Sequence, residues 1–250
     1  MKNLFLCLFT LVFVGCAAIH ASTKYTNNTN NFKHLEDSSV IVSCEAPTPK
    51  KWKERRPDLP DFLPASGSGT IIYHESGGSW YILTAAHVVK DCVQNFEISW
   101  IDHDGDHHLE IQRVGLNSRR DLAIYKTKAT FSVQRTYVKL AKEGPSLGEE
   151  IYMAGYPGLT RPYFILTKGF IANAFATMEG TTIFLIDGQI TFGNSGGASV
   201  NKNMELIGVN VVIVPEMFYG YQLGMAVHTD EIWKFIKKTD KSLYGKLLDG

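Results

Sequence analysis

The sequence predicts an all-β fold, in which short antiparallel strands build a sandwich or barrels and a single short helix closes the chain. Valine, isoleucine, threonine and tyrosine recur in short runs, as they do in strands. Turn signals separate these runs, such as ESGG (75–78) and the Asp-Gly pair in DHDGDH (102–107). About a dozen runs follow one another from residue 66 onwards, and helical periodicity is clear only near the end.

The runs can be read off in order. The predicted strands are GTIIYH (69–74), SWYILTA (79–85), FEISWI, HLEIQRVG, DLAIYKT (121–127), EEIYMAG, FILTKGFIANA, TTIFLID, ASV, ELIGVNVVIV and YQLGMAV. The helix is HTDEIWKFIKKT (228–239), where Ile232, Phe235 and Ile236 fall on one face behind the capping residues Thr229 and Asp230.

Composition excludes some functions. The 25 basic and 25 acidic side chains balance, so no electrostatic footprint for nucleic acid is present. Apolar residues make up 44% of the chain, enough for one sizeable core. HDGDHH (103–108) carries three histidines and two aspartates, but its central Asp-Gly and flanking strands favour a solvated hairpin tip over a metal site. No cofactor or metal is expected.

The first 21 residues are predicted to be a signal peptide. Leu4–Val14 is an apolar core of 11 residues, which suits export and is short for a membrane span. FVGC, ending at Cys16, resembles a bacterial lipoprotein box, although Phe13 stands where leucine is usual. Cleavage near Ala21 and an uncleaved anchor are the alternatives. We therefore expect a periplasmic or secreted protein, which lipidation of Cys16 would tether to a membrane.

Residues 22–64 are predicted to form an N-terminal tether and a wrapping loop. Residues 22–39 are polar and aperiodic, which indicates a disordered tether. The basic run Lys50–Arg56 lies among prolines and indicates a solvated loop, with attraction to anionic lipid as the alternative. Cys44 and Cys92 form an even pair in an oxidising compartment. We expect a disulfide between them; two buried free thiols are the alternative.

Three motifs carry residues suited to acyl transfer: ILTAAHVV with His87, RRDLAIYK with Asp121, and FGNSGG with Ser195. A serine hydroxyl needs a hydrogen-bonded base, and neutral imidazole has a suitable pKa. The imidazole in turn needs a carboxylate to fix its tautomer. Each motif is weak alone, but together they predict a His-Asp-Ser triad.

The turn around Ser195 is also predicted to hold the oxyanion. Its oxyanion hole comprises Gly193, Asn194 and Ser195, with the N–H groups of Gly193 and Ser195 pointing into one cavity. GNSGG also fits G-x-S-x-G, the nucleophile elbow of α/β-hydrolases. That fold requires a helix after the serine, whereas strand-like ASV and ELIGVNVVIV follow here.

These motifs resemble the chymotrypsin-like serine proteases of the trypsin superfamily, and most closely the HtrA (Do-like) branch. The resemblance rests on SGSGTIIYH with SWYILTAAHVV, on DGDHHLEIQRVGLNSRRDLAIYK, on ITFGNSGGASVNKNMELIGVNVVIV and on YQLGMAVHTDEIWKFI. It implies two perpendicular six-stranded antiparallel barrels within residues 65–240. The first would span about 65–143, the second about 144–228, and the closing helix 229–239. His87 and Asp121 would come from the first barrel and Ser195 from the second.

The resemblance implies further details. No PDZ domain is expected, because few residues follow the closing helix. Asn194 stands where trypsin-like zymogens carry an aspartate that pairs with a freed N-terminus, so activation by trimming is not expected. Ala198 replaces the usual proline. The substrate pocket would be formed by Gln189, Ile190, Phe192, Leu223, Gly224 and Met225, in a segment of strand running from Gln222.

The expected function is a serine endopeptidase that acts through an acyl-enzyme on unfolded or exported proteins. A pocket without an acidic residue would accept small or medium apolar P1 side chains. The alternative is a catalytically silent protease-fold binding module. Proteins or peptides are the expected partners; the oligomeric state does not follow from the sequence.

Overall fold

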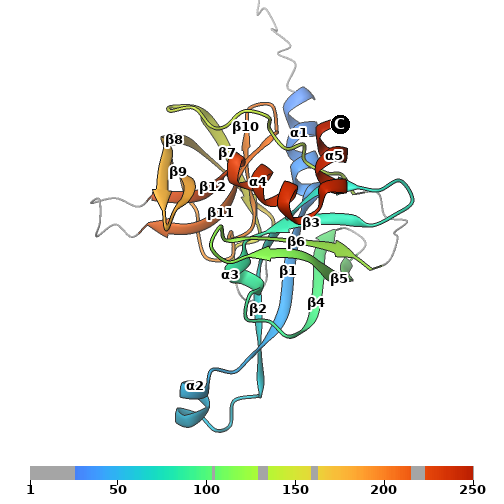
Figure 1. The fold of residues 1–250 in the computed structure, drawn as a ribbon, viewed down its shortest axis with the longest axis vertical. Helices are drawn as coiled ribbons and strands as arrows, with labels where there is room; N and C mark the ends of the chain where they lie inside the picture. Colours follow the sequence, from blue (N-terminus) through green and yellow to red (C-terminus); the bar gives the residue numbers. More distant parts are fainter. Residues whose placement is uncertain (1–25, 103–104, 129–134, 159–162, 215–222, 250) are drawn as a thin grey trace, which may run out of the picture.

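The chain folds into two closed antiparallel β-barrels of six strands each (Figure 1). The computed structural model describes residues 26–102, 105–128, 135–158, 163–214 and 223–249. The strand orders are β1-β2-β3-β6-β5-β4 and β10-β11-β12-β9-β8-β7. Closure satisfies every strand edge, which an open sheet cannot do. The predicted fold class is therefore confirmed.

The first barrel begins earlier than expected. Its strands are β1 (Ser39–Pro47), β2 (Phe62–His74), β3 (Trp80–Thr84), β4 (Gln94–Asp102), β5 (Gly105–Asn117) and β6 (Leu122–Thr127), with the short helix α3 (Ala86–Val89) after β3. β1 pairs with both β2 and β4 and so closes the ring. The boundary placed at about residue 65 was wrong, because the barrel cannot close without residues 39–47.

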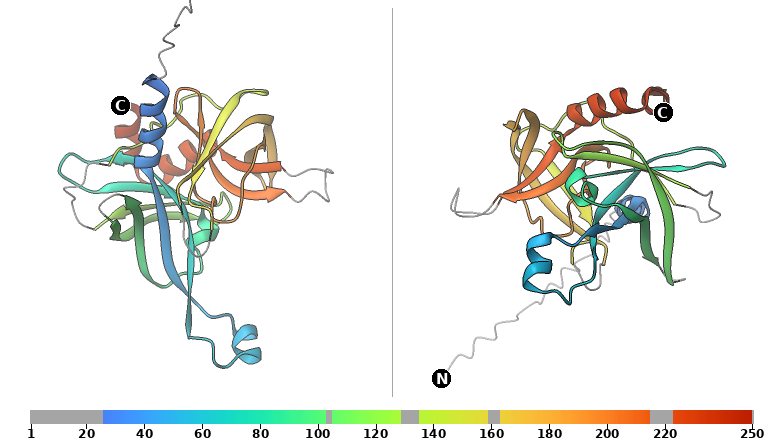
Figure 2. Two further views of the ribbon diagram at one scale, coloured as in Figure 1. Left: turned by 180° about the vertical axis from the view of Figure 1, so that it is seen from behind. Right: turned by 60° about the horizontal axis from the view of Figure 1, so that its bottom comes forward.

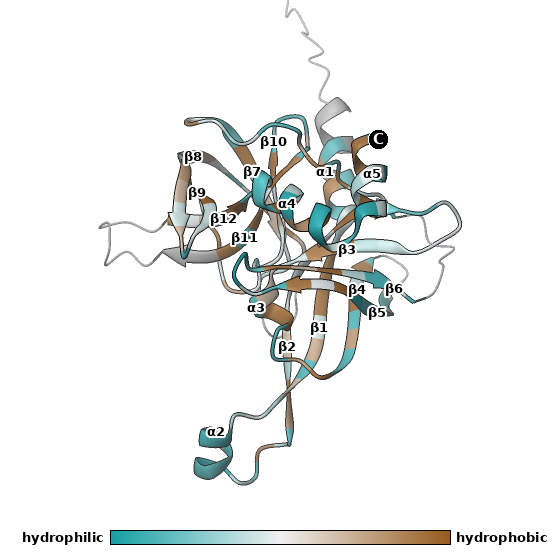
Figure 3. Cartoon of the chain, in the orientation of Figure 1, coloured by the Kyte–Doolittle hydropathy of each residue, from teal (hydrophilic) through white to brown (hydrophobic). Residues whose placement is uncertain are grey.

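The second barrel follows the predicted runs more closely. Its strands are β7 (Glu150–Gly155), β8 (Ile165–Met178), β9 (Thr181–Asp187), β10 (Ala198–Asn201), β11 (Leu206–Val214) and β12 (Leu223–His228). Ile151, Met153, Phe184 and Ile186 are fully buried in its core. Figure 3 shows apolar residues recurring along the strands of both barrels.

The segment predicted as a disordered tether contains the helix α1 (Thr26–Ser38). The sequence of this segment does not predict a helix packed on the domain, since few of its residues are apolar. Leu35 is fully buried, and Phe32 meets Tyr152 of β7 edge-to-face at 5.1 Å. Arg135, in the segment between the barrels, donates to the Glu36 carbonyl oxygen. Tertiary contacts, rather than helix propensity, therefore hold α1.

The segment predicted to wrap the domain instead projects from it. The strands β1 and β2 carry α2 (Lys50–Arg55) away from the barrels as an arm (Figures 1 and 2). No residue of α2 is buried, and Trp52 is 54% exposed. The start of α1 and the whole of α2 lie at opposite ends of the long axis (Figure 1).

Two helices close the chain across the outside of the barrels (Figure 2). α4 (Thr229–Thr239) matches the predicted helix and buries Ile232, Phe235 and Ile236. Its N-cap is His228 rather than the predicted threonine and aspartate: the His228 Nδ1 accepts from the Asp230 amide at 3.1 Å. α5 (Lys241–Asp249) follows it. Among the described residues, no helix is long and apolar enough to cross a membrane.

A disulfide joins Cys44 of β1 to Cys92, just after α3. Both cysteines are buried, and their Cα atoms lie 5.9 Å apart. The bond fixes the first strand of the barrel to the segment that follows His87. Cys16 lies outside the described residues, as does the predicted signal peptide.

Candidate active site

His87 and Asp121 meet at one end of the first barrel. His87 lies in α3, directly after the fully buried strand β3. The Asp121 carboxylate receives two hydrogen bonds from His87, one from Nδ1 to Oδ2 at 2.6 Å and one from the backbone amide to Oδ1 at 2.7 Å. This double contact fixes the ring and places the proton on Nδ1, so Nε2 is left to accept a proton.

Asp121 holds an unusual backbone conformation. Its φ is +53°, in the left-handed region that costs most residues energy. Hydrogen bonds to the closing helix α4 and from the second barrel hold the preceding turn. Arg120 donates to Glu231 of α4 at 2.7 Å, and Thr181 of β9 donates to the Arg119 carbonyl oxygen at 2.8 Å. The turn that carries the carboxylate is therefore fixed by the barrel that carries Ser195.

The buried carboxylate of Glu231 accepts the hydrogen bond from Arg120 and so helps to hold the turn before Asp121. Burial opposes its ionisation, but hydrogen bonds from Lys234 and Arg120 outweigh that effect and hold the pKa of Glu231 below its usual value. Its side chain is only 7% exposed. Nothing in the sequence pattern singled out Arg120 or Glu231, because they are 111 positions apart.

Two peptide groups of the turn around Ser195 are held by hydrogen bonds to their carbonyl oxygens. The Phe192 carbonyl accepts from the Gly158 amide at 3.2 Å, and the Asn194 carbonyl accepts from the Gly197 amide at 2.9 Å. A planar trans peptide points its C=O and N–H in opposite directions. The amides of Gly193 and Ser195 therefore point away from these partners. Within the described chain neither amide donates to an acceptor.

Asn194 does not belong with those two donors. Its amide donates to the Thr191 carbonyl oxygen at 3.1 Å, and its side chain is buried with Oδ1 unpaired. Of the three residues predicted to form the oxyanion hole, Asn194 therefore does not offer its amide as a third donor in this structure. The direction of each amide depends on the φ of +97° at Gly193, where a Cβ would lie 2.8 Å from the Gly158 nitrogen and the Tyr156 oxygen.

The Ser195 hydroxyl lies next to the histidine segment but is turned aside. It donates to the Val211 carbonyl oxygen of β11 at 3.1 Å, and no hydrogen bond joins it to His87 in the part of the chain described. The two segments nonetheless adjoin: a Cβ on Gly67 would touch both Val88 and the Ser195 carbonyl oxygen. Val211 also lines a cavity of about 180 Å³ beside His87 and Asp121.

The residues expected to form a substrate pocket divide into two groups. Ile190, Leu223 and Met225 are buried, and a Cβ on Gly224 would lie 2.5 Å from the Ile190 side chain. Phe192, in contrast, is 87% exposed. The Gln189 side chain is exposed, and its carbonyl oxygen accepts from Thr167. Gln222 lies outside the described residues.

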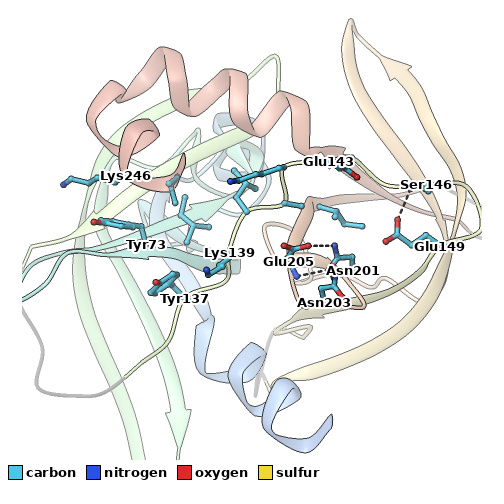
Figure 4. Close-up of a pocket in the computed structure, with 17 residues that line it drawn as sticks. Tyr73, Tyr137, Lys139, Glu143, Ser146, Glu149, Asn201, Asn203, Glu205 and Lys246 are labelled. Carbon is cyan, nitrogen blue, oxygen red and sulfur yellow. Dashed lines mark hydrogen bonds between the residues drawn. The ribbon is translucent and has the colours of Figure 1, made fainter. Parts of the chain in front are cut away.

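Two other features lie apart from this site. A cavity of about 590 Å³ lies between the inter-barrel segment, the β10–β11 turn and α5 (Figure 4). Its lining includes Lys139, Glu205 and Lys246, and none of the predicted site residues belong to it. In HDGDHH, residues 103–104 lie outside the described part. His107 stacks on Trp100 at 4.8 Å and contacts Asp102.

Two antiparallel barrels with histidine and aspartate from the first and serine from the second define the chymotrypsin-like class of serine protease folds. The sequence profile of the family described as "Trypsin-like peptidase domain" matches residues 67–209. The chain belongs to this family.

Several staphylococcal proteins named "Serine protease HtrA-like" are similar to the chain. One from Staphylococcus aureus (strain bovine RF122 / ET3-1) is 27% identical over 235 residues, which cover 90% of this chain and 29% of the relative. Those from strains MRSA252 and USA300 are 26% and 27% identical, covering 87% and 90% of this chain and 28% and 29% of theirs. The chain thus spans less than a third of the length of these relatives.

Proposed function

We propose that the chain is a serine endopeptidase in which His87, Asp121 and Ser195 cleave peptide bonds through an acyl-enzyme. The observation that carries the proposal is the fixed His87–Asp121 pair, with a serine turn beside it whose two amides lack acceptors. These are the parts acyl transfer requires: a nucleophile, an oriented base and an oxyanion hole.

The first step needs the Ser195 side chain to rotate. Rotation about χ1 would release Oγ from the Val211 carbonyl oxygen and bring it towards His87 Nε2. His87 then takes the hydroxyl proton as Oγ attacks the substrate carbonyl carbon, while the Gly193 and Ser195 amides stabilise the oxyanion. His87 returns the proton to the leaving amine. Water then attacks the acyl-enzyme by the same route and frees Ser195.

The substrate and the location are also part of the proposal. Ile190, Leu223 and Met225 carry no charge, which favours small or medium apolar P1 side chains in unfolded or exported proteins. The apolar segment Leu4–Val14 supports export to the periplasm or the medium, with Cys16 as the site of lipidation. Mapping of cleavage sites in a proteome, compared between wild type and Ser195→Ala, would define the P1 preference.

The test of activity is serine reactivity. A peptidyl organophosphonate should label the wild-type protein, and wild type should cleave casein. Ser195→Ala should do neither, whereas Ser242→Ala in α5, an exposed serine far along the chain, should behave as wild type. If the wild type is not labelled and does not cleave casein, the protease hypothesis fails and the catalytically silent binding module remains. The hydrogen bond from Ser195 to Val211 would then explain why Ser195 does not react.

A further inference from the structure

Ser68 of β2 connects the first barrel to the turn that carries Ser195. Its hydroxyl donates to the Gly193 carbonyl oxygen at 2.7 Å and accepts from the Tyr156 amide at 2.8 Å. Its backbone amide donates to the Ser195 carbonyl oxygen at 2.8 Å. Its carbonyl oxygen accepts from Thr84 at 2.7 Å, at the end of the strand that leads to His87. Ser68 is fully buried.

The hydroxyl holds one peptide group in particular. Ser68 binds the carbonyl oxygen of the Gly193–Asn194 peptide, and the amide of the same peptide donates to the Thr191 carbonyl oxygen. Both ends of this peptide unit are therefore hydrogen-bonded. A glycine at φ +97° has little resistance of its own to a peptide flip. The Gly193–Asn194 unit joins the two peptides that carry the Gly193 and Ser195 amides, so a flip would change the direction of one of these amides relative to the other. Asn194 has no charge with which to hold the turn through an ion pair.

We propose that Ser68 is the positioning residue of the oxyanion hole: its hydroxyl, presented by the first barrel, fixes the Gly193–Asn194 peptide of the second barrel and so keeps the Gly193 and Ser195 amides directed together at the oxyanion. The inference rests on the proposed protease function and assigns Ser68 no contact with the substrate.

The surroundings require a side chain as small as serine. A Cβ on Gly155 or on Gly197 would lie 3.2 Å from the Ser68 Cβ, so the side chain is enclosed on two sides. An added methyl would be crowded, and alanine would leave the Tyr156 amide and the Gly193 carbonyl without their partner. A hydroxyl suits the site because it donates and accepts at once.

The test compares Ser68→Ala with Thr70→Val. Thr70 lies two residues along the same strand, is buried, and has a hydroxyl without a hydrogen-bond partner, so its variant controls for loss of a buried hydroxyl. In Ser68→Ala we expect kcat for a peptide substrate to fall about 10- to 100-fold with KM within about threefold, less than the loss of a whole oxyanion donor. Phosphonate labelling should slow in parallel. Thr70→Val should match wild type in both.

A second measurement does not depend on activity. Hydrogen exchange of the Tyr156 amide should quicken at least about tenfold in Ser68→Ala and stay unchanged in Thr70→Val. An unchanged kcat in Ser68→Ala, or an equal loss in Thr70→Val, would overturn the role. Should Ser68→Ala not fold, Ser68→Cys takes its place: a thiol is a weaker donor, so kcat should again fall at constant KM, and a wild-type kcat would overturn the proposal. An inactive wild type would refute the protease function alone, and the exchange of the Tyr156 amide would still decide the role of Ser68.

Discussion

Removal of the Cys44–Cys92 disulfide should destabilise the folded chain by about 4 kcal/mol. The bond closes a loop between residues 48 positions apart. In the chain-entropy treatment such a link removes about 14 cal/mol/K from the unfolded state, which is about 4 kcal/mol at 25 °C. Both cysteines are buried, so the double variant Cys44→Ala/Cys92→Ala replaces them with small apolar groups and adds no buried polar atom.

Urea unfolding followed by tryptophan fluorescence would measure this difference. The double variant should unfold at lower urea with a larger m-value, since its unfolded chain is no longer cross-linked. A reducing agent should lower the midpoint of wild type towards that of the variant and leave the variant unchanged. A loss below about 1 kcal/mol, or an equal response of both proteins to the reducing agent, would refute the reasoning.

Three further predictions concern other parts of the fold. Arg120→Met removes one hydrogen-bond partner of the buried Glu231 and should lower the free energy of unfolding in urea by about 2 kcal/mol. The loss should be smaller than for a buried ion pair with a single partner, because Lys234 still binds Glu231. A change below about 0.5 kcal/mol would contradict this prediction. Burial lowers the pKa of His228, although neighbouring carboxylates oppose it, so the unfolded state binds more protons; stability should fall as pH drops below about 6.5. Melting temperatures of His228→Asn, which keeps a capping acceptor, should vary less with pH in that range, and equal slopes would count against this. Gly196→Ala, at φ +87° with a Cβ driven against the Ser68 oxygen, should cost about 3 kcal/mol and abolish phosphonate labelling, unlike the exposed Gly77→Ala.

The sequence was sufficient for the fold class and for the parts of the site that short motifs carry. Strand periodicity and turn dipeptides are local signals, so most strands and α4 could be predicted from them, whereas the two barrels were implied by the resemblance of the motifs to chymotrypsin-like proteases. The histidine, aspartate and serine motifs each lie within a few residues of a strand end. The structure brings His87 and Asp121 within hydrogen-bond distance, as their order along the chain suggested.

What sequence could not supply depends on contacts between distant residues. α1 has a polar composition typical of a tether, and only the burial of Leu35 and the contact of Phe32 with Tyr152 make it a helix of the domain. Asn194 was placed in the predicted oxyanion hole because it lies between the two predicted donors, Gly193 and Ser195. The direction of its amide follows from dihedral angles and from Thr191, which a residue pattern does not encode.

The division of the site between two barrels makes activity more sensitive than stability to changes at their junction. Reacting groups need to be held within about 0.5 Å, and a displacement of about 1 Å can cost 100-fold in rate. Polar contacts cross the junction near the site, among them Ser68 with Gly193 and Arg120 with Glu231. Loss of one such bond removes about 1–2 kcal/mol from a folding free energy of about 5–15 kcal/mol, so the barrels stay folded. The same loss allows His87 and Ser195 to move apart, because among the described residues no hydrogen bond joins their side chains. Variants at this junction should therefore lose kcat by a large factor while they stay folded, with the free energy of unfolding lowered by about 1–2 kcal/mol.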